Sequence, residues 1–163
     1  MALENAVMKH AFHESGRYIT RPCVLILAGK GNNGADGYAL ARRINSHELS
    51  VTVCEESEST SSMALLQKKR AEKIGVRFIN LYELDDFIEE KSFDITVVVD
   101  CLYGSGFHLP LNPVTEAIIN SVSKIEAYKI SCDVPTGLDS LGNGKLQNNI
   151  SLFQKKMLYR LKY

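Results

Sequence analysis

Apolar and polar residues alternate along the chain in two repeating patterns. Short runs rich in valine, isoleucine and cysteine are typical of buried strands, because they are apolar but too short for a core helix. Such runs occupy 23–29, 50–56, 76–81, 94–101 and 128–135. The segments between them carry apolar residues at helical spacing, at 36–45, 61–75, 83–90 and 112–125. Strands that alternate with helices predict a parallel sheet joined by right-handed crossovers.

Several residues mark the expected helix ends. Asn112 and Pro113 suit the N-cap and the first helical position, and Gly75 is typical of a residue that ends a helix. Asp36 stands at the expected start of the helix after the first strand, where it would either cap the helix or repel a bound anion. The acidic, serine-rich stretch 55–62 has the composition of a solvated loop.

The first strand leads into a glycine-rich loop, LAGKGNNGADG (27–37). Its letters GKGNNG fit G-x-G-x-x-G, which in dinucleotide-binding folds holds a pyrophosphate at a helix N-terminus. Glu55 follows about 20 residues later, where such folds carry a ribose-binding acid; a solvated side chain is the alternative. The chain suits one domain, which leaves no second domain for hydride transfer, and Asp36 would repel a pyrophosphate. Both points disfavour a dehydrogenase.

Two further strands end in polar loops that contain glycine. Asp100 ends the fourth strand and Asp133 ends the fifth, with Thr136 three residues further on. In a doubly wound sheet of strand order 3-2-1-4-5, ligands bind beyond the carboxyl ends of the strands at the switch point. We therefore expect one crevice that gathers Asn33, Asp36, Asp100, Asp133 and Thr136.

Two or three carboxylates in one crevice repel each other, so one of them is protonated or a cation lies among them. The available ligands are carboxylate, amide, hydroxyl and carbonyl oxygens. These are hard ligands, which favour a hard cation over zinc or copper. The ligand chemistry alone leaves K⁺, Na⁺, Mg²⁺ and Ca²⁺ open.

Composition narrows the classes of function. Of the 163 residues, 19 are Lys or Arg and 19 are Asp or Glu. This balance disfavours a nucleic-acid or membrane-surface protein, which usually has a basic excess. The chain has no apolar run long enough to span a bilayer and no signal-peptide pattern at its start. The four cysteines lie in or beside apolar runs without a C-x-x-C pair, which predicts buried, reduced thiols and a cytoplasmic location.

Three loops, in this order, carry a family resemblance. GNNGADG, VDCLYGSGF and CDVPTGLDS resemble the signature loops of the NAD(P)HX epimerase family, also called the YjeF N-terminal domain, whose usual forms are GNNGGDG, VDA-x-FG-x-G and D-I-P-S-G-x-D. LENA (3–6) resembles the end of the family's opening helix motif, MENAG. The resemblance implies an α/β fold with a three-layer, Rossmann-like, doubly wound and mostly parallel sheet. We expect a single domain over 1–163, truncated at both ends, with 141–163 as an atypical C-terminal segment.

The resemblance also implies a reaction. Family members interconvert the R and S epimers of NADHX and NADPHX, hydrated cofactors with an added hydroxyl at C6 of the nicotinamide ring. A separate ADP- or ATP-dependent dehydratase, specific for the S epimer, then completes the repair of both. The family binds one K⁺ per subunit. Nucleic acid and membrane are not expected partners, and a homodimer is left open.

Residue by residue, the motifs assign roles to this chain. Asp133 matches the acid that contacts the substrate, and it is our candidate for the proton transfer that epimerisation at C6 requires. Asn33, Asp100 and Thr136 match the cation ligands, with threonine in place of serine. Substrate binding is assigned to Asn32, Asn33, Gly34, Ala35, Asp36, Gly104, Ser105, Gly106, Phe107, His108, Leu109, Pro110 and Asp133.

Ala35 stands where the family has glycine. If this position needs a positive φ, alanine costs on the order of 1 kcal/mol. The alternative to an enzyme is a non-catalytic YjeF-type binding or scaffold module, or an inactive truncated homologue. A scaffold has no need of Asp133, so the presence of this residue favours the enzyme.

Overall fold

A parallel sheet with strand order β3-β2-β1-β4-β5 is the frame of the molecule. The computed structural model describes residues 2–12, 19, 21–45, 48–59, 61–104 and 110–137. Within these ranges the strands are β1 (Cys23–Ala28), β2 (Ser50–Glu55), β3 (Arg77–Asn80), β4 (Ile95–Cys101) and β5 (Tyr128–Ser131). The helices are α1 (Ala2–Ala11), α2 (Asn32–Ile44), α3 (Ser62–Lys73), α4 (Leu81–Lys91) and α5 (Pro113–Ser123). The predicted strand order is confirmed.

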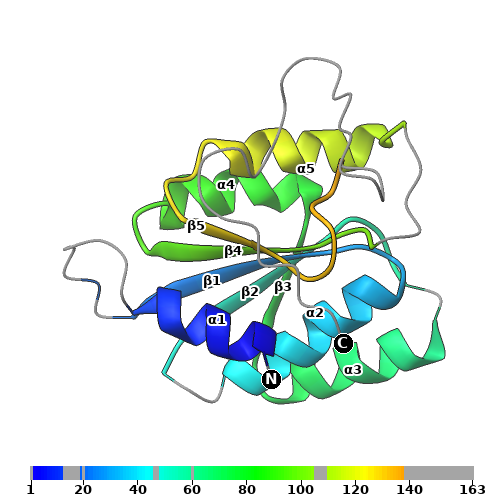
Figure 1. Ribbon diagram of the computed structural model, residues 1–163, viewed down its shortest axis with the longest axis horizontal. Helices are drawn as coiled ribbons and strands as arrows, with labels where there is room; N and C mark the ends of the chain where they lie inside the picture. The colour runs from blue at the N-terminus through cyan, green and yellow to red at the C-terminus, as the bar shows by residue number, and fades with distance from the viewer. Residues whose placement is uncertain are drawn as a thin grey trace.

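Helices cover both faces of the sheet. Figure 1 shows α4 and α5 on one face and α1, α2 and α3 on the other, which gives three layers. Each face has its own apolar cluster, one shared with α1–α3 and the other with α4 and α5. Along β1 the side chains alternate between the clusters, with Val24 and Ile26 in the first and Leu25 and Leu27 in the second. The sheet is buried on both sides, which explains the continuous apolar runs of β1 and β4.

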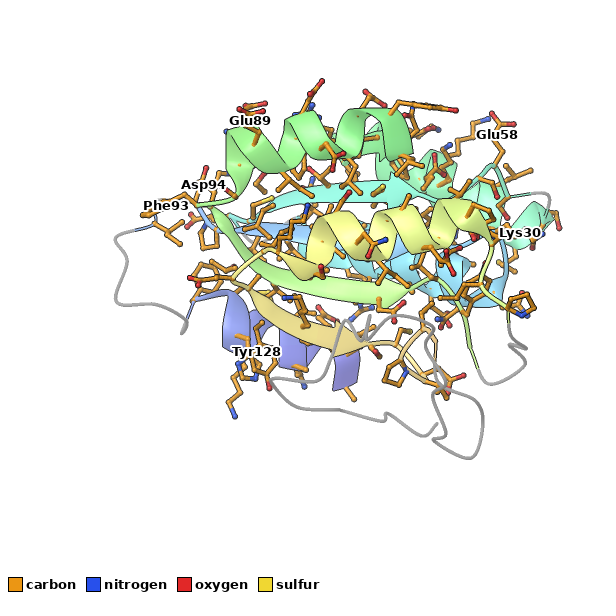
Figure 2. The ribbon with its side chains drawn as sticks, turned by 90° about the horizontal axis from the view of Figure 1, so that it is seen from above. Lys30, Glu58, Glu89, Phe93, Asp94 and Tyr128 are labelled. Atoms are coloured by element: carbon orange, nitrogen blue, oxygen red, sulfur yellow. The ribbon has the colours of Figure 1, made fainter. Side chains whose placement is uncertain are left out.

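The carboxyl ends of β1, β4 and β5 lie side by side. Leu27 pairs with Asp100, and Asp100 pairs with Ser131. The pairing extends one residue beyond the strands, because Gly29 N donates to Cys101 O at 3.1 Å and Cys132 N donates to Asp100 O at 2.9 Å. Figure 2 shows this end of the sheet at Lys30 and Glu58, opposite Phe93 and Asp94. The predicted convergence of the three loops is therefore confirmed.

Helix α2 begins at Asn32, four residues earlier than expected. Gly31 is its N-cap, with φ −93° and ψ −163°, so Asp36 lies in the second turn and does not cap the helix. The helix includes glycines that sequence analysis placed in a loop. A Cβ at Gly34 would lie 1.8 Å from Gly29 O, so the missing side chain lets the helix start directly on the backbone of the preceding loop. This close packing outweighs the low helix propensity of glycine.

Ala35 does not incur the backbone cost considered above. It is buried inside α2, and Glu48 is the one non-glycine residue with positive φ in the described part of the chain. Gly75 has φ 82° after α3, as its assignment as a helix stop requires. Asn112 caps α5 by accepting a hydrogen bond from Thr115 N at 2.9 Å. Both predicted helix ends are confirmed.

Two other expectations about burial have different outcomes. All four cysteines are buried and free, as predicted. The stretch 55–62 is not simply a solvated loop, because Glu56 is 8% exposed and Ser59 is 5% exposed. Ser59 Oγ donates to Lys30 O at 2.9 Å, which joins this stretch to the glycine-rich loop. None of the helices in the described ranges is long and apolar enough to cross a membrane.

Replacement of Gly34 by alanine tests the close packing of α2. We expect Gly34→Ala to lower the free energy of unfolding by about 2 kcal/mol, even after the roughly 1 kcal/mol that alanine gains in helix propensity, because its methyl group meets backbone that cannot move freely. Urea unfolding measures the change. Gly31→Ala is the matched control, since no atom lies within 4 Å of its Cβ position, and it should cost at most about 1 kcal/mol as an N-cap change. Equal stability of the two variants would contradict this account.

Candidate functional site

Asp100 organises the centre of the site from the end of β4. Its carboxylate is fully buried, and Oδ1 accepts hydrogen bonds from Thr136 Oγ1 at 2.7 Å and from Leu102 N at 3.1 Å. Oδ2 accepts from Thr136 N at 2.7 Å. Burial raises the pKa of the Asp100 carboxyl, and the hydrogen bonds from Thr136 and Leu102 act in the opposite direction. One side chain thus holds the loop after β5 to the loop after β4.

Asp133 lies against the start of the loop after β4, at Gly104. We call the segment 104–110 of this loop, which is assigned to substrate binding, the second loop. It is half-buried, and a Cβ on Gly104 would lie 2.9 Å from Asp133 Oδ2. A side chain at position 104 would therefore displace the carboxylate. Asp133 therefore lies beside Gly104, the first residue of the assigned substrate segment, whereas Gly106 lies outside the described residues.

Asn33, in the first turn of α2, joins this helix to the loop after β4. Its Nδ2 donates to Tyr103 O at 2.7 Å, which fixes the orientation of the amide and leaves Oδ1 as the atom suited to a cation. Asp36 lies one turn further along α2. Its side chain is exposed as a whole, but the protein on one side displaces water from the carboxyl, and this partial desolvation raises the pKa. The pKa of the buried Cys101 thiol is raised by its hydrogen bond to Cys132, by burial and by nearby carboxylates that include Asp36. A Cβ at Gly37, the next residue of α2, would lie 3.0 Å from Cys101 Cβ, so Asp36 lies near the same end of β4.

The remaining residues assigned to substrate binding differ in exposure. Asn32 and Pro110 are exposed, whereas Gly34 and Ala35 are buried in the contact between α2 and the sheet. Five of the assigned residues lie outside the described residues, namely Ser105, Gly106, Phe107, His108 and Leu109. Asn33, Asp100, Gly104, Asp133 and Thr136 are the assigned residues that the fold links through the contacts given above.

Comparison with known proteins identifies the family. A family model described as "YjeF-related protein N-terminus" matches residues 2–157. The chain belongs to this family. The bifunctional NAD(P)H-hydrate repair enzyme Nnr of Helicobacter pylori is 39% identical over 142 residues, which cover 87% of this chain and 28% of that protein. The NAD(P)H-hydrate epimerase of Rhodopirellula baltica is 31% identical over 119 residues, which cover 71% of this chain and 48% of that protein.

The chain therefore spans less than half the length of these two relatives. The fold has its own comparison. A crystal structure of the yeast protein ynu0 superposes with a TM-score of 0.76 at 22% sequence identity, covering 91% of this chain and 63% of the yeast chain. The chain therefore shares its three-layer α/β architecture with a solved structure. This is the fold that the resemblance of the three loops implied.

Neither expectation for Glu55 is correct in this member of the YjeF family. Its Oε1 accepts a hydrogen bond from Tyr38 OH at 2.7 Å, and its Oε2 pairs with Lys68 Nζ at 2.7 Å. The carboxylate is thus neither solvated nor presented to a ribose, because it joins β2 to α2 and α3. Burial, together with the hydrogen bond to this carboxylate, raises the pKa of the Tyr38 phenol far above its usual value.

Glu56 is the residue that sequence analysis missed. Its Oε1 accepts hydrogen bonds from Tyr103 OH at 2.5 Å, from Asn112 Nδ2 at 2.6 Å and from Thr115 Oγ1. The alternation of side chains along a strand was the available signal. Continued one residue beyond β2, it directs Glu56 to the α5 face, opposite Glu55.

The described residues contain no group of three or more His, Cys, Asp or Glu side chains placed to bind one metal ion. A cation here would depend on neutral oxygens beside the Asp100 carboxylate. The Oδ1 atom of Asn33 and the Oγ1 atom of Thr136 supply such oxygens. This hard donor set with a single buried carboxylate suits a cation of low charge. The residues present therefore fit the K⁺ that the family resemblance implies.

Replacement of Asp100 by asparagine tests its organising role. In Asp100→Asn, either amide orientation places an N–H group against a backbone N–H, of Thr136 or of Leu102. We expect a loss of about 1–3 kcal/mol in the free energy of unfolding, measured by urea titration. Thr136→Ser keeps both hydrogen bonds to Asp100 and should cost less than about 1 kcal/mol. A larger loss in Thr136→Ser than in Asp100→Asn would show that the methyl contact, not the carboxylate, holds the loop.

Proposed function

We propose that this chain is an NAD(P)HX epimerase, an isomerase that interconverts the R and S epimers of hydrated NADH and NADPH. The observation that carries the proposal is the position of Asp133 against Gly104, at the end of the sheet where Thr136 binds Asp100 and Asn33 binds Tyr103. The proposal is supported by a relative, 31% identical, that bears the name NAD(P)H-hydrate epimerase.

The proposed reaction inverts C6 of the nicotinamide ring. Inversion breaks and remakes a bond to oxygen, or opens and closes the ring, and either route moves a proton on and off the departing group. Asp133 is the proposed proton carrier, because its carboxylate is half-buried and its Oδ2 faces the second loop. In this proposal the start of α2, from Asn32 to Asp36, and the segment Gly104–Pro110 orient the substrate.

We further propose one K⁺ per subunit, bound by Asn33 Oδ1, Asp100 and Thr136 Oγ1. When bound, the ion would supply a positive charge that offsets the carboxylates of the crevice and favours one substrate orientation. Asp100 holds the loop after β5 through its hydrogen bonds from Thr136. Asn33 keeps its amide oriented through Tyr103 O.

The proposed partner is an ADP- or ATP-dependent dehydratase that consumes the S epimer. Its link to this chain is supported by the name of the Helicobacter pylori relative, a bifunctional repair enzyme of which this chain matches 28%. A cytoplasmic location is part of the same proposal, because nicotinamide cofactors are used there and the thiols are unpaired.

The first functional test removes the ionisable carboxyl group of the proposed proton carrier. Asp133→Asn keeps the shape of the side chain and one acceptor oxygen, but it cannot take up and release a proton at this position. We expect the epimerisation rate to fall at least about 100-fold, the usual contribution of a general acid–base group. The assay follows R-NADHX with an S-specific dehydratase in excess. Unfolding by urea should be unchanged.

The outcomes of this test separate two failures. Wild-type turnover that Asp133→Asn matches would refute the mechanism and leave the proposed function intact. A folded wild-type protein with no turnover would refute the epimerase and favour a binding module. Thr136→Ser serves as the control, since it retains the hydroxyl and should keep the rate within about threefold of the wild type.

Exchange of the cation tests the proposed K⁺ site without depending on turnover. A ligand that binds only the folded state stabilises it, so K⁺ should raise the melting temperature by about 2–4 °C relative to tetramethylammonium at equal ionic strength, which corresponds to roughly 1 kcal/mol. Thr136→Val removes the hydroxyl oxygen and should abolish this difference, whereas Thr136→Ser should retain it. An equal K⁺ effect in wild type and Thr136→Val would exclude a site that uses this residue.

A further inference from the structure

One carboxylate oxygen contacts both ends of the second loop. Tyr103 immediately precedes Gly104, where the assigned substrate segment begins, and Asn112 follows two residues after Pro110, where it ends. Glu56 Oε1 accepts a hydrogen bond from Tyr103 OH at 2.5 Å and another from Asn112 Nδ2 at 2.6 Å. A side chain from the loop after β2 therefore sets how far apart the two ends of another loop lie. We call Glu56, Tyr103 and Asn112 the loop clasp.

The two ends also contact each other. Asn112 Nδ2 donates to Tyr103 OH at 2.9 Å. The orientation of the Asn112 amide is determined independently, because its Oδ1 caps α5 by accepting from Thr115 N. Thr115 Oγ1 also donates to Glu56 Oε1, and it lies 3.0 Å from Tyr103 OH. The clasp is thus anchored to the first turn of a helix, which is a rigid support for a loop end.

The clasp is also connected to the start of α2, through Tyr103. Tyr103 supplies its hydroxyl to Glu56 and its backbone carbonyl to Asn33 Nδ2, at 2.7 Å. Glu56 N donates to Ala28 O at 2.9 Å, which fixes the backbone of Glu56 to the end of β1. A change at Glu56 is therefore transmitted through one residue to Asn33, which is assigned to both substrate and cation.

The burial of Glu56 makes its carboxylate depend on the hydrogen-bond donors of the clasp. Glu56 is 8% exposed, and its Oε2 is buried without a hydrogen-bond partner in the described part of the molecule. The donors on Oε1 therefore compensate the burial of the charge, and loss of one of them leaves the carboxylate less satisfied. Burial and the hydrogen bond to Glu56 raise the pKa of Tyr103 to about 12, so the phenol remains a donor at neutral pH.

We propose that Glu56 is a positioning residue, which holds the two ends of the second substrate loop through Tyr103 and Asn112 and thereby sets affinity for the hydrated nicotinamide cofactor. The proposal rests on the proposed function, in which this loop binds that substrate. Glu56 binds the two residues that flank the substrate segment, Tyr103 and Asn112, so we expect it to act on substrate binding, whereas Asp133 is the proposed proton carrier. The expected signature is a rise in KM at nearly constant kcat.

The experiment measures KM and kcat for R-NADHX in variants of the clasp. Tyr103→Phe keeps the ring and the carbonyl that binds Asn33, and it removes only the hydroxyl. Asn112→Ser keeps a cap for α5 and removes the donor to Glu56. We expect KM to rise about 5- to 10-fold in both variants and in Glu56→Ala, with kcat within about twofold of wild type. Glu56→Gln retains an acceptor oxygen and should restore KM to within about threefold of wild type.

The neighbouring acid provides the matched control. Glu55→Gln weakens the contacts to Lys68 and Tyr38 on the opposite face, so it should lower thermal stability and leave KM within about twofold of wild type. An equal rise of KM in Glu55→Gln would overturn the proposal, because general destabilisation would then explain it. Unchanged KM in Tyr103→Phe and Asn112→Ser, or a fall in kcat alone, would also overturn it. If Glu56→Ala does not fold, the KM values of Tyr103→Phe and Asn112→Ser test the proposal without it.

A second readout does not need turnover. Deuterium uptake in peptides that cover 100–116 should rise in Tyr103→Phe and Glu56→Ala and stay at the wild-type level in Glu55→Gln. If the wild-type protein shows no epimerisation, the proposed function is refuted. Deuterium uptake then tests whether the clasp holds the ends of the loop. No increase in uptake in Tyr103→Phe would then overturn the clasp as well.

Discussion

The buried carboxylate of Asp100 is the constraint on which the candidate site depends. A charge without contact to solvent is costly unless hydrogen bonds compensate it. Here the donors come from two loops, Leu102 on its own side and Thr136 after β5. The need to satisfy one charge therefore specifies where the loop after β5 turns. That turn brings Asp133 against Gly104, so the geometry of the candidate proton carrier follows from an interaction that it does not itself make.

Close backbone packing is the second constraint, and it changes how the glycine-rich loop is understood. The letters G-x-G-x-x-G suggest a phosphate cradle, in which glycine allows the backbone to approach a ligand. In this chain Gly34 allows α2 to approach the backbone of Gly29, and a Cβ at Gly29 would lie 2.0 Å from Leu102 O. These two glycines serve contacts within the protein. The site is assembled by the same contacts, because they bring Asn33 to the loop after β4.

Two adjacent glutamates show how one strand end supports two different structures. Glu55 faces α2 and α3, where Tyr38 and Lys68 bind it, and Glu56 faces α5 and the ends of the second loop. Alternation of side chains across the sheet separates them. Both carboxylates are consumed in holding helices and loops in place. Asp133, the half-buried acid beside Gly104, is the candidate proposed for chemistry.

The sequence by itself determined the class of fold, the strand order and the end of the sheet at which the loops meet. These features follow from local patterns, since apolar runs of strand length alternate with helical segments and the parallel connections have one hand. The caps at Asn112 and Gly75 were also local and were predicted correctly. Tertiary structure alone decided the start of α2, the partners of Glu55 and the contacts of Glu56. Each of these depends on contacts that a periodic pattern does not specify: a helix glycine packed on the backbone of the preceding loop, a lysine from the next helix, and a tyrosine 47 positions away. Periodicity records which face a residue occupies, but it carries no information about which residue the fold brings to meet it there.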